Sequence, residues 1–294
     1  MTTTTDAPED KKMPLLDHLI ELRQRLLYSV VALLVTFLIC FYFAQPIFQY
    51  LAQPLADVML EHGIAEHQRR LIFTALTEVF FTYVKVAFFA AAFICFPIFL
   101  VQFWLFVAPG LYKHEKSALA PFLAATPFLF FLGGALVYYL IFPMAATFFI
   151  GFEVPATETS LPIQLEPKVN EYLSLLMQLI FAFGLCFQLP VVMTLLARVG
   201  LTTSQGMAAK RKYAIVGVFI VAAIFTPPDP LSQLSLAVPI IILYEISILM
   251  ARMVEKKRAK AEAEDDLDLG GDDDDDGPDD NSSGSSKDVV PPAP

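Results

Sequence analysis

The chain has 294 residues, of which 56% are hydrophobic and only 17% are charged. This composition excludes an ordinary soluble domain of the same length, because the apolar residues fall in long runs that leave no polar face toward water. The formal net charge of −10 comes from the tail: residues 255–294 hold 14 acidic against 5 basic residues, so the body of the protein is nearly neutral.

Residues 1–25 form a cytoplasmic N-terminal segment that ends in an amphipathic helix. Four leucines repeat at helical spacing on one face of this segment: Leu15, Leu19, Leu22 and Leu26. The pattern predicts a helix that lies at the membrane surface and runs into the first span. The apolar run that follows is too long for the apolar region of a signal peptide and lacks a clear cleavage site, so we expect it to stay as a span.

Six apolar runs make residues 26–251 a transmembrane domain, with predicted spans at 26–44, 79–107, 117–142, 172–197, 213–226 and 231–251. A hydrocarbon core of about 30 Å takes about 20 helical residues to cross, so the second run is long enough to tilt and the fifth is short. Prolines within the runs predict kinks in most of the spans: Pro97, Pro121, Pro127, Pro190 and Pro239. The expected fold class is an all-α polytopic membrane protein with six kinked helices.

Basic residues set the expected orientation. The N-terminal segment, two alternate loops and the C-terminal segment together hold sixteen Lys and Arg, against three in the loops at 45–78 and 143–171. Positive charge stays on the cytoplasmic side. The distribution therefore predicts that both termini are cytoplasmic and that these two loops face outward.

The tail, residues 252–294, begins basic and then turns acidic, with a Gly-, Ser- and Pro-rich end. Low hydrophobicity and like-charge repulsion predict that it is disordered. Its run Asp272–Asp276 could attract calcium, but it lacks the glycine and glutamate at the spacing of a calcium loop and is typical of a solvated segment.

Signatures of catalysis and metal binding are missing from the sequence. There is no HExxH, no glycine-rich phosphate loop and no G-x-S-x-G elbow, so we expect no enzyme activity, no cofactor and no metal. The three cysteines, Cys40, Cys95 and Cys186, each lie inside an apolar run and are expected to be small core residues rather than disulfide or zinc ligands.

Three polar residues fall inside predicted spans. Lys85 can extend its ammonium to the outer interface, whereas Glu245 lies deep enough to be a functional candidate. Gln188 lies near the midplane beside Pro190. It fits either a hydrogen bond to a neighbouring helix or a contact with a docked partner.

Two acidic residues on the predicted cytoplasmic side have ordinary structural explanations. Glu115 stands in a short loop, where Lys113 and Lys116 flank it and can neutralise its charge. Glu21 is placed to form an i, i+4 ion pair with Arg25. Spacing alone does not favour a functional role for either residue over these structural explanations.

Four motifs resemble, in chain order, those of the TatC family, the six-span core subunit of the twin-arginine protein translocase. The resemblance covers about residues 13–254 and leaves out the acidic tail. The motifs are His18-Leu-Ile-Glu-Leu-Arg-Gln-Arg-Leu-Leu27, Phe106-Val-Ala-Pro-Gly-Leu-Tyr-Lys-His-Glu-Lys116, Phe183-Gly-Leu-Cys-Phe-Gln-Leu-Pro190 and Thr226-Pro-Pro-Asp-Pro-Leu-Ser-Gln233.

The resemblance implies a function. TatC proteins receive folded cargo through a signal peptide that carries two adjacent arginines. They assemble with the single-span TatB and TatA subunits, within a complex in which we expect several copies of the chain, for transport driven by the proton-motive force. The implied location is the bacterial cytoplasmic (inner) membrane, and no nucleic acid is involved.

The resemblance also implies roles for individual residues. Glu21 and Glu115 match the two carboxylates assigned to the twin-arginine site, and a planar carboxylate suits a guanidinium because it accepts two parallel hydrogen bonds. The residues that match positions framing this site, or the motif arginine of the N-terminal helix, are Phe106, Leu111, Tyr112 and Arg23. The residues that match positions of partner docking or assembly are Gln188, Pro54, Asp229 and Gln233. Gln188 departs from the family, which commonly has Glu there.

Two other functions compete with this interpretation. A small-solute secondary transporter could use Lys85, Gln188 and Glu245 as a polar pathway, although it would need facing half-helices and a midplane site that the sequence does not indicate. A passive membrane scaffold is the third possibility.

Overall fold

The computed structural model describes residues 15–64, 66, 68–107, 116–154, 161, 163–226 and 230–269. Every regular element in these ranges is helical. In chain order they are α1 (Leu15–Tyr42), α2 (Ala44–Glu61), α3 (Glu78–Val107), α4 (Lys116–Leu136), the π-helix η3 (Val137–Ile141), α5 (Phe142–Ile150), α6 (Val169–Cys186), α7 (Leu189–Arg198), α8 (Ser204–Ala209), α9 (Arg211–Phe225) and α10 (Pro230–Leu269).

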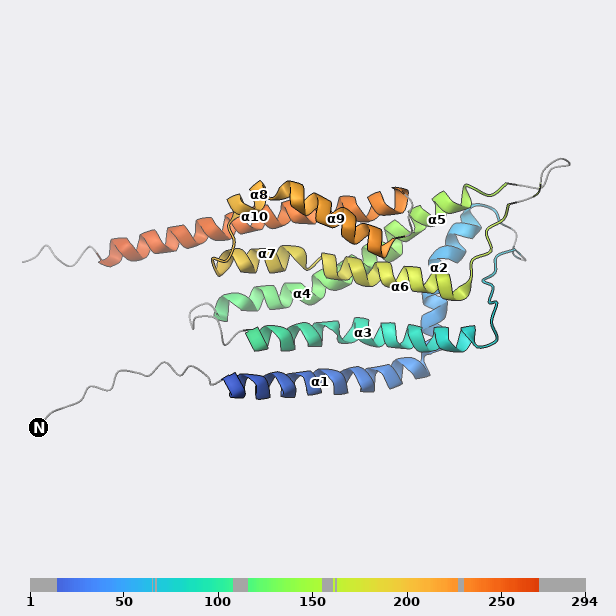
Figure 1. The fold of residues 1–294 in the computed structure, drawn as a ribbon, viewed down its shortest axis with the longest axis horizontal. Coiled ribbons are helices and arrows are strands. Elements are labelled where there is room, and N and C mark those ends of the chain that lie inside the picture. The colour runs from blue at the N-terminus through green and yellow to red at the C-terminus, as the bar shows by residue number, and fades with distance from the viewer. Residues whose placement is uncertain are drawn as a thin grey trace, which may run out of the picture.

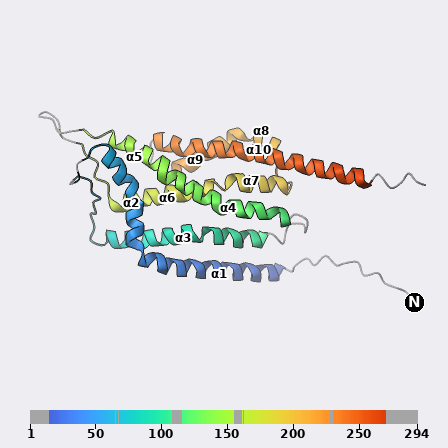
Figure 2. The same ribbon diagram turned by 180° about the vertical axis from the view of Figure 1, so that it is seen from behind.

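The long helices lie side by side along the long axis of the molecule. Figure 1 shows α1 at one edge, then α3, α4 with α6 and α7, and α9 with α10 at the opposite edge; Figure 2 shows the same order from behind. Helix α2 runs across the others near one end of the bundle. The start of α1 and the end of α10 both lie at the opposite end of the bundle, on the left in Figure 1, but at opposite edges of it.

In the described part of the chain, five helical stretches are long and apolar enough to cross a membrane. They are Leu19–Tyr42, Glu78–Phe103, Ala124–Ile150, Val169–Arg198 and Ser232–Lys257. Each overlaps one of the expected spans. The fifth expected span, 213–226, corresponds to α9, whose 15 residues reach only about 22 Å. A sixth crossing by α9 therefore stays a prediction.

Two segments, α2 and the end of α10, differ from the sequence-based expectation, whereas the continuation of the amphipathic segment into the first span agrees with it. The loop at 45–78 contains the 18-residue helix α2, because the apolar residues of that segment repeat at helical spacing and bury one face. Helix α1 continues without a break from Leu15 to Tyr42, so the amphipathic segment and the first span are one helix. Helix α10 runs on to Leu269, beyond residue 252, where the sequence predicts disorder. Residues 252–269 are rich in Ala, Glu, Lys and Arg, which favour helix.

The fourth apolar run is divided by a break next to its proline. Helix α6 ends at Cys186, Phe187 and Gln188 form a turn, and α7 begins at Leu189. Pro190 has no amide hydrogen, so it cannot donate the helical hydrogen bond to the carbonyl of Cys186, four residues earlier. The break thus falls where the proline removes the helical bond.

Helices α4 and α6 approach closely through glycines. A Cβ atom on Gly133 would lie 2.8 Å from the carbonyl oxygen of Phe183, and one on Gly184 would lie 2.6 Å from the ring of Phe130. Phe130 and Phe183 are fully buried. Small residues let helices pack at short range in a membrane, where hydrophobic burial alone does not drive association.

At the end of the bundle where α2 crosses, short main-chain pairings hold the connecting segments together. The amide of Ile72 donates to the carbonyl of Pro167 at 3.0 Å, and the amide of Val169 donates back to Ile72 at 2.9 Å. Val154 and Ile163 form an antiparallel bridge, with main-chain bonds of 2.9 and 3.0 Å. The first pairing joins the segment before α3 to the segment before α6, and the second joins the segment after α5 to it.

We predict that Gly133→Ala destabilises the protein by about 1–3 kcal/mol, because the added methyl group meets a main-chain oxygen that side-chain motion cannot relieve. The matched control is Gly217→Ala in α9, where a Cβ atom meets nothing within 4 Å. There the loss of glycine's extra unfolded-state entropy should leave stability unchanged or slightly higher. Thermal unfolding in detergent measures both, and an equal response would contradict the close α4–α6 contact.

Candidate functional site

The candidate site lies where the first turns of α1 meet the last turns of α3. The guanidinium of Arg25 donates from Nε to Oε1 of Glu21 at 3.0 Å and also forms an ion pair with that oxygen through Nη2. Its Nη1 donates to Oε1 of Gln102 at 3.2 Å. A carboxylate, a guanidinium and an amide therefore form one chain of hydrogen bonds between the two helices.

This chain of hydrogen bonds is partly open to the surroundings. The side chains of Arg25 and Glu21 are 23% and 26% exposed. An ion pair this exposed contributes little to stability, so its partners can be exchanged at small cost. The hydroxyl of Ser29 donates to the carbonyl of Arg25 at 3.0 Å and satisfies an extra main-chain lone pair one turn farther in. The i, i+4 pair expected from the sequence is thus present, and α3 adds a second acceptor to it.

The structure describes only part of the predicted signal-peptide site. Arg23 lies on α1 and is exposed. Phe106 lies on α3, one turn beyond Gln102, but its side chain is outside the described part of the structure. Leu111, Tyr112 and Glu115 lie in 108–115, outside the described residues, in the segment that joins the end of α3 to the start of α4.

Gln102 is a site residue that the sequence analysis missed. It lies inside an apolar run, one helical turn before Phe106, so its spacing from a motif residue was a usable signal. The contact with Arg25 is between residues 77 positions apart, and no local pattern predicts such a pairing.

The three polar residues inside spans do not meet. Gln188 is 7% exposed and its Nε2 donates to the carbonyl of Thr126 at 2.9 Å. Lys85 donates to Oδ1 of Asn170 at 2.6 Å. Each residue is paired with a different neighbour, which gives no support to a shared solute pathway.

Glu245, the third of these residues, pairs with Arg211 at 2.7 Å between α10 and α9. Both side chains are about half exposed. Arg211 neutralises the carboxylate of Glu245. A structural ion pair therefore explains why Glu245 occurs in an apolar run.

The assembly candidates occupy separate places. Pro54 is buried inside α2. Gln233 donates from Nε2 to the carbonyl of Phe219 at 3.3 Å and so links α10 to α9. Asp229 lies outside the described residues. Within the described ranges, no three His, Cys, Asp or Glu residues gather as a metal site would require.

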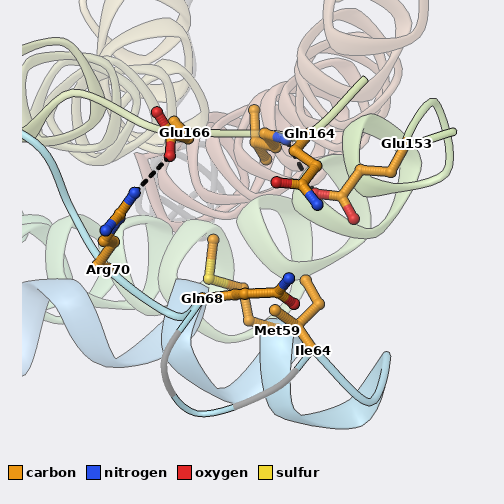
Figure 3. A pocket seen from close by; sticks show the side chains of 8 residues that line it. Met59, Ile64, Gln68, Arg70, Glu153, Gln164 and Glu166 are labelled. Carbon is orange, nitrogen blue, oxygen red and sulfur yellow. Dashed lines mark hydrogen bonds and ion pairs between the residues drawn. The ribbon is translucent and has the colours of Figure 1, made fainter. Parts of the chain in front are cut away.

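A small cavity, of about 130 Å³, lies at the end of the bundle where α2 crosses and is drawn in Figure 3. Arg70 pairs with Glu166 at 2.8 Å across it, and Glu153 accepts a hydrogen bond from the amide of Leu165 at 2.9 Å. These charged groups already have protein partners, so the contacts are those of a structural cap that joins two loops.

The chain was compared with known proteins. The sequence profile of TatC, Sec-independent protein translocase protein, matches residues 17–239. A Sec-independent protein translocase protein TatC from Magnetococcus marinus is 49% identical over 263 residues, which cover 90% of this chain and 93% of that protein. The corresponding protein of Escherichia coli K12 is 38% identical over 250 residues, covering 85% and 92%. A crystal structure of the twin arginine translocase receptor TatC superposes with a TM-score of 0.69 at 36% identity and covers 81% of this chain and 99% of that one.

We predict that Gln188→Leu lowers stability by about 0.6–2 kcal/mol, because it removes a hydrogen bond between helices inside the membrane. Gln178→Leu is the matched control: Gln178 lies exposed on α6, so the same change should be neutral or stabilising in lipid. Unfolding of both variants in detergent or nanodiscs gives the comparison. If the Gln188→Leu variant is as stable as the parent, the hydrogen bond from Gln188 to Thr126 does not stabilise the contact between α4 and the α6–α7 turn.

Proposed function

Because this chain belongs to the TatC family of Sec-independent protein translocase proteins, we propose that it is the receptor subunit of a twin-arginine translocase. In this proposal it binds the twin-arginine signal peptides of folded precursor proteins at its cytoplasmic face. It then assembles with TatB and TatA for transport driven by the proton-motive force across the cytoplasmic (inner) membrane. Membership makes the chain a component of a protein translocase, a transport role and not that of a catalytic enzyme.

The observation that carries the proposal is the partly exposed carboxylate of Glu21, held at the end of the bundle by an arginine of its own chain. A carboxylate that already accepts hydrogen bonds from a guanidinium has the chemistry to accept them from another. An arginine of the signal peptide can replace Arg25, which keeps Gln102 as an acceptor after the exchange. The number of charge-assisted hydrogen bonds is then conserved, while the carboxylate of Glu21 passes from Arg25 to the arginine of the signal peptide.

The second arginine of the signal needs a second carboxylate, and we assign that role to Glu115. The segment that carries it connects α3 to α4 and so starts and ends at the same end of the bundle as Glu21. Phe106, Leu111 and Tyr112 would frame the site with apolar surface next to the signal's own apolar stretch. Arg23, which is exposed on α1, would contact the polar residues that flank the arginine pair.

Assembly would use other surfaces of the bundle. We assign Gln233 and Asp229, at the junction of α9 and α10, to contacts with the single-span subunits. Pro54 on α2 would help copies of the chain to associate. Gln188 would act through its bond to α4, by fixing the surface that a partner helix meets, and its neutral amide would not titrate. Both termini would face the cytoplasm, which agrees with the start of α1 and the end of α10 lying at one end of the bundle.

We predict that Glu21→Lys weakens the binding of a twin-arginine peptide by at least about tenfold to a hundredfold, because at least one charge-assisted hydrogen bond of about 1.5–3 kcal/mol is lost and cation faces cation. Glu21→Gln should weaken binding less. Adding Glu115→Lys should remove binding, as should lysines in place of the peptide's two arginines, since an ammonium lacks the guanidinium's planar fork.

Fluorescence anisotropy of a labelled peptide with the protein in nanodiscs measures these affinities. Glu171→Lys is the control, because it makes the same charge change at the first turn of α6, at the other end of the bundle. Unchanged affinity in the Glu21→Lys, Glu115→Lys double variant would remove this site from consideration.

A further inference from the structure

An apolar cavity of about 380 Å³ opens between α2, α3 and the α4–η3 helix, on the face of the bundle where Figure 2 shows α2 in front. Phe89 and Phe93 of α3 form one wall and Phe131 of α4 the other, with Ile180 of α6 between them. Ile47 and Tyr50 of α2 close the end of the cavity toward the loops.

A second cavity, of about 330 Å³, adjoins the first one. The two share Tyr50, Tyr138 and Tyr139 in their linings. The second cavity continues along α2 past Asp57 and Glu61, both of which are exposed. Among the described residues that line it there are two carboxylates and no Lys or Arg. The two adjoining cavities are thus apolar on one side of the shared tyrosines and acidic on the other.

The tyrosines at the junction are held in place. The rings of Tyr50 and Tyr138 stack with centroids 4.7 Å apart, and the Tyr138 hydroxyl donates to the main-chain carbonyl of Tyr50 at 2.7 Å. The hydroxyls of Tyr50 and Tyr139 lie 3.1 Å apart. This hydrogen bond raises the pKa of Tyr50 above its ordinary value, so the Tyr50 hydroxyl stays protonated. Tyr138 and Tyr139 lie in the π-helix, a feature often found at functional sites.

We propose that the two cavities form one binding site for a phospholipid with an amine headgroup, of the phosphatidylethanolamine class. An acyl chain fills the apolar cavity. The hydrogen-bonded pair of Tyr50 and Tyr139 hydroxyls has one O–H left, which donates to the phosphate or the ester groups. The ammonium lies beside Asp57 and Glu61. The site is at the opposite end of the bundle from Glu21 and does not depend on signal-peptide binding.

Shape and charge both favour this occupant. A helix about 10 Å across would fill 380 Å³ in less than about one turn, so the cavity suits a chain narrower than a helix. Two carboxylates without a basic neighbour repel an anionic headgroup and attract an ammonium. An ethanolamine ammonium also donates hydrogen bonds, which a choline headgroup cannot do.

Native mass spectrometry of the full chain, released from nanodiscs that hold equal parts of phosphatidylethanolamine, phosphatidylglycerol and phosphatidylcholine, tests the site. We expect phosphatidylethanolamine to be retained about twofold to tenfold over the other two, as weak exposed ion pairs allow. The variant Asp57→Asn, Glu61→Gln should lose this preference. Glu66→Gln, Glu171→Gln removes the same charge at exposed residues outside these two cavities and should keep the preference.

Ala135→Phe tests the apolar half of the site, because the larger side chain occupies the cavity that Ala135 lines. Retention of all three lipids should fall in this variant if its thermal unfolding shows that it is folded. Equal retention of the three lipids by the parent, or an unchanged preference in the Asp57→Asn, Glu61→Gln variant, would overturn the proposal.

Discussion

Lipid imposes the constraint on which this fold depends: a polar group inside the hydrocarbon must find its partner within the protein. Most hydroxyls in the spans meet it locally. Thr82 donates to the carbonyl of Glu78 and Ser247 to that of Leu243, each at 2.7 Å and one turn back along the same helix. Where a helix is broken, the partner comes from another helix, as in the bond from Gln188 to Thr126.

The two ends of the bundle differ in their polar contacts. At the end where α2 crosses, main-chain pairings and the Arg70–Glu166 pair join the loops into a cap. At the other end, Glu21, Arg25 and Gln102 keep charge at the boundary of two helices, with Glu21 and Arg25 about a quarter exposed. In the receptor proposed above, the carboxylate of Glu21 would be accessible to a cationic signal, and Arg25 would neutralise it until the ligand took its place.

The family and the positions of the long spans could be predicted from the sequence, because they depend on motifs and on apolar runs. The TatC resemblance is confirmed, and the five longest apolar helices overlap expected spans. Helix α2 was missed because a loop was expected wherever a run was too short to span, although its residues Leu51, Leu55 and Val58 repeat at helical spacing. The extension of α10 to Leu269 was missed because charge was weighed above helix propensity. Gln102 depends on a contact between distant parts of the chain, which a single sequence does not encode locally.

The most direct test of the receptor assignment is site-specific photocrosslinking. A benzophenone amino acid would replace Phe103, which is exposed on α3 next to Gln102, or Tyr139, which is exposed toward the other end of the bundle. A radiolabelled twin-arginine precursor should crosslink at position 103 and should not crosslink through its arginine region at position 139. The crosslink at position 103 should disappear when the arginine pair of the precursor is changed to lysines. A crosslink at 103 that survives this change, or one from the arginine region at 139 alone, would contradict recognition of the signal at Glu21.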